Sequence, residues 1–305
     1  MSTGVRTQRL GLVGLGRMGM PMSARLASAG FAISAFDILD DRRPTVSGQP
    51  GVHWAESAGG AADGADVLVT MLPGAQEVSD VIAEVVGRLP AGSTWIDMST
   101  ASPATARAIA AAAENKGIRS LDAPVGGGPN AARDGQLIAF VGGQRAVLDA
   151  HRDVLGALTC RIEHVGAAGA GYTVKLLVNL LWFGQALASA EALTLAHQAG
   201  IDPDALRQAV DHSAAASAFM ARDASALLAG DDLTSFSLTR VCDQLATILD
   251  LGAELQVPLE LGAVISDLHH QALVHYGDVD GELLGARLVA ERAGVALHRA
   301  QRQPT

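Results

Sequence analysis

Three glycines near the start of the chain have a spacing that can receive a phosphate group. They follow the apolar run Leu10–Val13 and open a helix-like segment, in the pattern GxGxxG. In this pattern the first glycine permits a tight turn, the second lets a pyrophosphate approach the backbone, and the third lets helix pack closely on strand. The helix N-terminus then offers N–H groups and the positive end of its dipole to an anion. We expect the turn to bind a dinucleotide through Gly14, Leu15, Gly16, Arg17, Met18 and Gly19.

An acidic residue follows the second apolar run. Ala32–Phe36 has the pattern of a strand and ends at Asp37, about where a carboxylate accepts hydrogen bonds from the adenosine ribose. A carboxylate there repels a 2′-phosphate, which favours NAD over NADP as the cofactor. Arg42 and Arg43 follow closely and could serve a phosphate, so NADP stays the alternative. The other interpretation of Asp37 is a solvated turn residue.

Lys175 is an unusual cation in this chain. The 22 lysines and arginines include only two lysines, Lys116 and Lys175. A lysine in a helix is ordinarily a solvated surface cation, but Lys175 lies among Val174, Leu176 and Leu177. Such surroundings predict a partly desolvated amine with a lowered pKa. That amine can take a proton from a substrate hydroxyl as a hydride leaves the same carbon.

Asn179 lies one helical turn after Lys175, and the i, i+4 spacing puts both on one face. We expect Asn179 to orient the substrate oxygen. The alternative is a structural amide that bonds between helices.

The elements that must position these residues follow from the apolar pattern. Short β-like runs alternate with helical stretches through the first half of the chain, which implies a parallel sheet flanked by helices. After Gly171 only helical periodicity is found. The prediction is an α/β protein with an N-terminal Rossmann-type doubly wound sheet and an all-α C-terminal domain, divided into residues 1–167 and 168–305. The expected strands are Leu10–Val13, Ala32–Phe36, Val67–Met71, Thr94–Met98, Ile118–Leu121, Leu137–Val141 and Arg161–Val165.

The first helix of the second domain is expected from about Gly171 to His197. It is apolar nearly all round, as in a helix buried between domains or subunits, so we expect a homodimer or homotetramer. Its apolar stretch is interrupted by Asn179 and Gln185, short of the roughly 20 apolar residues that a membrane span needs. We therefore expect no membrane association.

Composition narrows the class of protein. Apolar residues make up 49% and charged residues 18%, as in a globular protein, and the net charge of −10 has the wrong sign for binding nucleic acid. Cys160 and Cys242 are too far apart in sequence for a structural zinc pair, and the N-terminus lacks the pattern of a signal peptide. We expect a cytoplasmic protein. The group His269, His270 and His275 lacks a metal-ligand spacing, so we expect these residues at the surface or an interface and no metal site.

Taken together, the motifs resemble those of the β-hydroxyacid dehydrogenase family over nearly the whole chain. The landmarks occur in the family's order. They are the glycine turn, MLPG at 71–74, IDMST at 96–100 with Pro103, DAPVGGG at 122–128, and the helix of Lys175 and Asn179.

The resemblance implies further site residues. Leu72 and Pro73 would line the adenosine side of the cofactor, and Thr100 would lie beside the nicotinamide. Gly127 and Gly128 would offer backbone N–H groups to a substrate carboxylate.

Three positions depart from the family pattern. Gly126 stands where the substrate loop usually carries a serine, Asn130 follows Pro129 in place of the usual glycine-ended pattern, and Cys242 replaces a lysine. The loss of a hydroxyl donor and an ammonium should weaken the binding of a small carboxylate, although Asn130 could reach the substrate instead. The substrate site would then comprise Gly126, Gly127, Gly128, Asn130, Lys175 and Asn179. We expect weak or absent activity on 3-hydroxyisobutyrate.

The leading hypothesis is therefore oxidation of a β-hydroxy acid, or a related small alcohol, with NAD and with Lys175 as general acid/base. An imine reductase is the second hypothesis, although such relatives usually carry Asp or Tyr where this chain has Lys175. A non-catalytic cofactor-binding module is the third, and the retention of Lys175 speaks against it.

Overall fold

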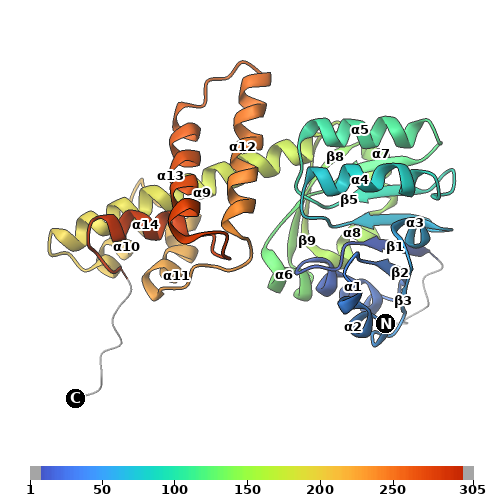
Figure 1. Cartoon of the computed structure of the whole chain (residues 1–305), viewed down its shortest axis with the longest axis horizontal. Helices are drawn as coiled ribbons and strands as arrows, with labels where there is room; N and C mark the ends of the chain where they lie inside the picture. Colours follow the sequence, from blue (N-terminus) through green and yellow to red (C-terminus); the bar gives the residue numbers. More distant parts are fainter. Residues whose placement is uncertain (1–7, 298–305) are drawn as a thin grey trace. The chain divides into compact units, whose positions relative to one another are not determined.

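The computed structural model describes residues 8–297. The chain divides into two compact units, Met1–Leu176 and Leu177–Thr305, and the division falls within one long helix, α9 (Ala170–Gln198) (Figure 1).

The first unit is built on a nine-stranded sheet. The path runs β3-β2-β1-β4-β5-β6-β8-β7, and β9 pairs with β8. The segment from β3 to β6 is parallel and has the strand order of a dinucleotide-binding fold, so the Rossmann-type prediction is confirmed. The strands are β1 (Arg9–Val13), β2 (Ala32–Phe36), β3 (Val52–Trp54), β4 (Val67–Thr70), β5 (Thr94–Asp97), β6 (Arg119–Asp122), β7 (Val125–Gly126), β8 (Leu137–Gly143) and β9 (Thr159–Gly166).

The sheet is mixed rather than wholly parallel. Strand β8 runs antiparallel to both β6 and β7, and β9 then runs parallel to β8. Apolar runs predict strands but carry no sign of direction, so the reversal at β8 was not expected. Strands β3 and β7 were also missed, because runs of three and two residues carry no readable alternation.

Helices cover both faces of the sheet (Figure 1). Their apolar side chains form a separate core on each face. The first core includes Met22 and Leu26 of α1 and Leu155 of α8, and the second includes Val78 of α4 and Ile109 of α5. The helices of this unit are α1 (Gly19–Ser28), α2 (Arg43–Ser47) after a 3₁₀ turn (Asp40–Arg42), α3 (Ala58–Ala62), α4 (Ala75–Val86), α5 (Pro103–Glu114), α6 (Gly128–Asp134), α7 (Arg145–Ala150) and α8 (Arg152–Leu158).

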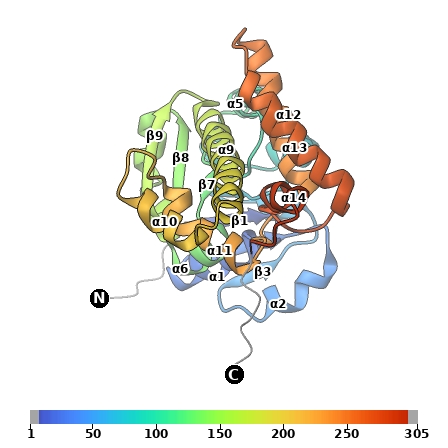
Figure 2. The same ribbon diagram turned by 90° about the vertical axis from the view of Figure 1, so that its left-hand side faces the viewer.

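Helices are the regular secondary structure of the second unit's described residues, which contain one isolated bridge, between Ser237 and Asp280. This agrees with the all-α prediction. Helices α12 and α13 lie side by side, as Figures 1 and 2 show. Beyond α9 the helices are α10 (Pro203–Asp211), a π-helical turn (Phe219–Asp223), α11 (Ala224–Ala229), α12 (Leu238–Glu254), α13 (Glu260–Tyr276) and α14 (Leu284–Arg292).

Helix α9 begins and ends within one residue of the prediction, but it is not buried on all sides. Leu177, Val178, Leu181 and Leu195 are each more than a third exposed. By length and composition α9 is apolar enough to cross a membrane, although the core helices of globular proteins pass the same test.

The histidine group was expected at the surface or at an interface, and His269 departs from this expectation. His269 is fully buried in α13 and its Nδ1 donates to the Ile265 carbonyl oxygen at 2.9 Å, whereas the adjacent His270 is exposed. Neighbouring residues on a helix point about 100° apart, so one faces the core and the other does not.

Candidate active site

The three glycines of the turn differ in the space that surrounds them. A Cβ at Gly14, where φ is +95°, would lie 2.3 Å from the Met71 carbonyl oxygen. A Cβ at Gly19 would lie 1.9 Å from the Gly14 carbonyl oxygen, so helix α1 can start here only with a glycine. A Cβ at Gly16, in contrast, would meet nothing within 4 Å, and Gly16 is exposed. The turn is closely packed at its ends and open in the middle, where a pyrophosphate approaches the backbone.

Asp37 follows β2 and bonds to this turn. Its Oδ2 accepts from the Leu15 backbone N–H at 2.6 Å, and its Oδ1 accepts from the Leu39 N–H at 2.9 Å. Each of the two nearby arginines has an acidic neighbour. Arg42 lies 3.4 Å from an Asp41 oxygen, and the Arg43 guanidinium pairs with Glu56.

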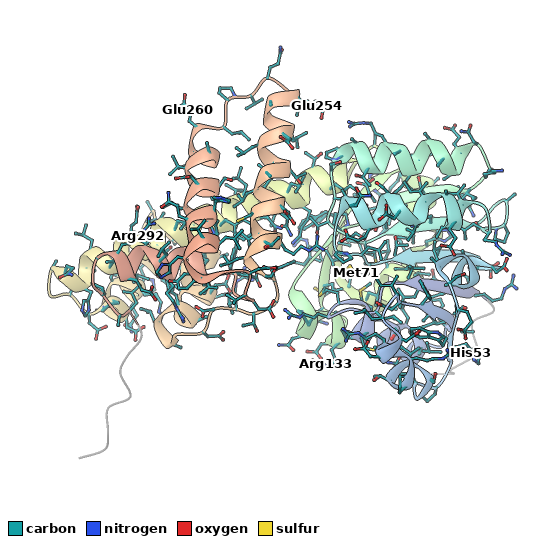
Figure 3. All side chains as sticks on the ribbon, in the orientation of Figure 1. His53, Met71, Arg133, Glu254, Glu260 and Arg292 are labelled. Atoms are coloured by element: carbon teal, nitrogen blue, oxygen red, sulfur yellow. The ribbon has the colours of Figure 1, made fainter. Side chains whose placement is uncertain are left out.

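The loops after β4 and β5 lie at the same edge of the sheet as the turn. The carboxyl ends of parallel strands meet at one edge, and β1 and β4 are neighbours there. The loop after β4 begins at Met71, which Figure 3 labels, and continues to Leu72 and the exposed Pro73. The Leu72 N–H donates to the Ser99 hydroxyl at 2.8 Å, which ties this loop to the one that carries Thr100. The first unit thus places together the cofactor residues predicted from sequence.

Lys175 lies in the first helical turns of α9 and is only 8% exposed. Its neighbour Tyr172 is completely buried, and the Tyr172 hydroxyl donates to Asp97 at the end of β5. Burial and the nearby Asp97 carboxyl raise the pKa of Tyr172 well above its ordinary value, so the hydroxyl keeps its proton as a donor. Burial also raises the pKa of Asp97, and its hydrogen bonds from Ser99, Tyr172 and Thr70 oppose that effect.

Asp122, at the end of β6, holds the start of the same helix. Its Oδ1 accepts from the Gly169 N–H at 2.9 Å and its Oδ2 from the Tyr172 N–H at 3.1 Å. A Cβ at Gly142 or at Gly171 would come within 2.8 Å of this carboxylate, so glycines on both sides make room for it. Burial raises the pKa of Asp122, and the backbone N–H donors oppose that effect.

The sequence reasoning did not identify Asp97, Asp122 or Tyr172 as functional. A signal was present, because an aspartate that closes an otherwise apolar strand must find partners when it is buried. The identity of those partners depends on the tertiary fold.

Asn179 belongs to the second unit, where its Nδ2 donates to the Gln244 Oε1 of α12. The structural alternative foreseen for Asn179, an amide that bonds between helices, is therefore observed. An amide has further hydrogen-bonding groups, so this bond fixes the direction of the group and leaves capacity for a ligand. Gln244 was missed, because its pairing with α9 is not readable from sequence.

The glycine loop between β7 and α6 adopts backbone conformations that favour glycine. Gly127 has φ of +121° and Gly128 has φ of +71°. A Cβ at Gly126 would meet only the edge of the Phe140 ring, at 4.0 Å. A side chain would therefore fit at Gly126. Asn130 is exposed and its Oδ1 accepts from Arg133 at 3.1 Å.

Cys242 is half-buried in α12, and burial together with Asp243 and Asp278 raises the pKa of its thiol. It cannot supply the positive charge of a lysine. In residues 8–297 no group of three His, Cys, Asp or Glu side chains could hold a metal ion.

Two family descriptions match the chain in succession. The family described as "NAD binding domain of 6-phosphogluconate dehydrogenase" matches residues 9–166. The family described as "NAD-binding of NADP-dependent 3-hydroxyisobutyrate dehydrogenase" matches residues 169–299.

Individual proteins show the same likeness. The 2-(hydroxymethyl)glutarate dehydrogenase of Eubacterium barkeri is 33% identical over 264 residues, which cover 85% of this chain and 87% of the relative. A structure of Mycobacterium tuberculosis 3-hydroxyisobutyrate dehydrogenase with L-serine has a TM-score of 0.82 at 30% identity and covers 93% of this chain and 99% of its own. An imine reductase of Streptomyces aurantiacus has a TM-score of 0.59 at 20% identity, covers 92% of this chain and 99% of its own, and shows a shared fold.

Proposed function

Since the chain belongs to the β-hydroxyacid dehydrogenase family, we propose that it transfers a hydride between NAD and a β-hydroxy acid or related small alcohol, with Lys175 as general acid/base. The chain is a dehydrogenase of the kind that acts on CH–OH groups. The observation that carries the proposal is the nearly complete burial of Lys175, in a chain that otherwise uses arginine for almost every cation.

The residues present fit a dinucleotide. A pyrophosphate would approach the backbone at the exposed Gly16, and Asp37, which is bonded to the turn, would accept from the ribose hydroxyls. NAD is favoured over NADP because Asp37 repels a 2′-phosphate and because Arg42 and Arg43 are paired with acidic neighbours. The cofactor residues in this proposal are Gly14, Leu15, Gly16, Arg17, Met18, Gly19, Asp37, Leu72, Pro73 and Thr100.

When bound, the nicotinamide supplies the hydride acceptor for the carbinol carbon. In the direction of oxidation, the Lys175 amine takes the proton of the substrate hydroxyl, and in reduction the ammonium returns it. Asn179 orients the same oxygen, and its bond to Gln244 keeps the amide in one direction.

The substrate is proposed to be a small carboxylate bound by the loop of Gly126, Gly127, Gly128 and Asn130. The relatives' names, 2-(hydroxymethyl)glutarate and 3-hydroxyisobutyrate dehydrogenase, both specify hydroxy acids. Gly126 offers no hydroxyl and Cys242 no positive charge, so 3-hydroxyisobutyrate is expected to be a poor substrate.

We further propose a cytoplasmic homodimer or homotetramer. Residues 1–167 would hold the cofactor, and residues 168–305 would complete the substrate site and the subunit interface. The exposed leucines and valine of α9 are the apolar surface that a second copy would cover. Both cysteines are free thiols, as a reducing compartment keeps them.

The test is the appearance of NADH across a panel of β-hydroxy acids, sugar acids and simple alcohols, run with both NAD and NADP. The proposal expects turnover of at least one hydroxy acid with NAD preferred. A panel that also contains a cyclic amine and its imine addresses the second hypothesis. Tight NAD binding without any turnover would favour a non-catalytic module and contradict the proposal.

A further inference from the structure

A buried hydrogen-bond network joins the loops that follow β4 and β5 to the first turn of α9. Asp97 is its centre and is completely buried. The carboxylate accepts from the Ser99 N–H at 2.9 Å and from the Tyr172 hydroxyl, and the nearby side chains of Ser99 and Thr70 lower its pKa. Three segments that are distant in sequence thus meet at one side chain.

The network extends beyond Asp97 on the side of the loops that follow β4 and β5, which carry Leu72 and Thr100 and are here called the cofactor loops. The Ser99 hydroxyl accepts from the Leu72 N–H, and the Thr70 hydroxyl accepts from the Trp95 indole N–H at 2.8 Å. Each hydroxyl thus accepts one bond and belongs to a side chain that lowers the pKa of Asp97. The bonds to Leu72 and Trp95 tie both side chains to the neighbouring backbone and strand.

On the other side, the network reaches the helix that carries Lys175. Tyr172 precedes Lys175 by three residues, so the two side chains are neighbours along one side of α9. The Tyr172 side chain is held by Asp97, and its backbone N–H is held by Asp122. Asp97 and Asp122 are paired residues of the neighbouring strands β5 and β6. The edge of the sheet therefore fixes where α9 starts and how α9 is rotated about its own axis.

We propose that Asp97 and Tyr172 are positioning residues for Lys175, which they hold in a fixed relation to the cofactor loops. The proposal rests on the function proposed above for Lys175, but its geometry lies entirely within the first unit. Removal of the Tyr172 hydroxyl should let the first turn of α9 move and Lys175 become mobile, while the glycine turn is untouched.

The first experiment measures the accessibility of Lys175 without any catalysis. Lys175 and the exposed Lys116 are the two lysines of the chain, so Lys116 is an internal reference for acetylation followed by peptide mass spectrometry. In the full chain, Tyr172→Phe should raise the labelling rate of Lys175 relative to Lys116 by about tenfold, the factor expected for the loss of a hydrogen bond to a charged group. Tyr276→Phe is the matched control, because it removes a tyrosine bond to Glu291 in the second unit. Equal labelling of Lys175 in Tyr172→Phe and Tyr276→Phe would overturn the proposal.

The second experiment is a double-mutant cycle on the best substrate of the panel. Tyr172→Phe should lower kcat by about tenfold with little change in KM or in NAD binding, and should have no further effect when Lys175 is already alanine. A merely structural role predicts that the two effects multiply, which would contradict the positioning role.

The outcomes separate this inference from the proposed function. If Lys175→Ala keeps the wild-type kcat, the acid/base role fails, while the labelling still decides whether Tyr172 holds Lys175. If Lys175→Ala is inactive but Tyr172→Phe changes neither labelling nor kcat, only the positioning inference fails. Should Tyr172→Phe not fold, Asp122→Asn is the second variant, since it weakens the cap on the same turn and should raise Lys175 labelling in the same direction.

Discussion

Gly16 and Gly19 are three residues apart, but the space around them differs completely. A side chain at Gly19 would collide with backbone, whereas a side chain at Gly16 would enter open space. Residues of one type in one motif are therefore under different constraints, since the fold requires a glycine at Gly19 but leaves open space at Gly16.

This difference predicts opposite results for two substitutions. Gly19→Val should lower the free energy of unfolding by about 1–3 kcal/mol or more, because the first turn of α1 must move. Gly16→Val should leave the stability near that of the wild type but raise the Kd for NAD, because the added methyl groups occupy the space of the pyrophosphate. Thermal unfolding and NAD titration measure the two effects. A Gly16→Val protein that binds NAD normally would show that the phosphates lie elsewhere.

Gly126 is the residue at which specificity should be most easily changed. A side chain fits there, since only the Phe140 ring edge lies 4.0 Å from a built Cβ. Gly126→Ser should lower KM for small hydroxy acids by about 10- to 100-fold, because a hydroxyl bond to a carboxylate contributes about 1.5–3 kcal/mol. Gly126→Ala is the control, and it should leave KM unchanged. Equal KM values for the serine and alanine variants would mean that the substrate carboxylate does not bind beside residue 126.

At the level of the elements, the sequence predicted α9 and the parallel strands of four or more residues well, because each has a continuous apolar run. Strands β3 and β7 and the reversal at β8 depend on pairing partners that a local pattern does not contain. The site residues show the same contrast between local sequence patterns and contacts made in the folded chain. Gly14, Asp37 and Lys175 stand out by type and spacing, whereas Gln244 and Tyr172 gain their roles only from contacts made in the folded chain.

Helix α13 carries a buried histidine whose titration should be visible in stability. Burial lowers the pKa of His269 below its ordinary value of 6.5, and its Nε2 has no hydrogen-bond partner. The folded chain therefore binds fewer protons than the unfolded chain below about pH 6.5, so stability falls as the pH decreases through that range. Each such group contributes up to about 1.4 kcal/mol per pH unit.

His269→Leu should flatten this pH dependence between about pH 7 and pH 5, as measured by denaturant unfolding at several pH values. His151, buried in the first unit with its pKa also lowered by burial, remains in that variant and keeps part of the slope. The exposed neighbour His270 provides the control substitution, His270→Leu. An unchanged slope in His269→Leu would mean that His269 accepts a proton in the folded chain as readily as in the unfolded one.

For the whole molecule, the first unit contains the glycine turn, the cofactor loops and the anchored turn of α9 that ends at Lys175. The second unit contributes Asn179, held by Gln244, and an α9 face with exposed apolar residues. The residues proposed for cofactor binding and the lysine proposed for proton transfer therefore lie on different elements.

The most direct measurement is the single-turnover rate of NADH formation in Lys175→Ala with NAD bound and the best hydroxy acid of the panel. The predicted result is a fall of about 10²–10⁴-fold in rate with NAD affinity unchanged, since a positioned acid/base contributes that much. The control is Lys116→Ala, which removes the chain's other, exposed lysine and should react like the wild type. A Lys175→Ala protein that forms NADH at the wild-type rate would contradict the assignment of Lys175 as the group that moves the proton.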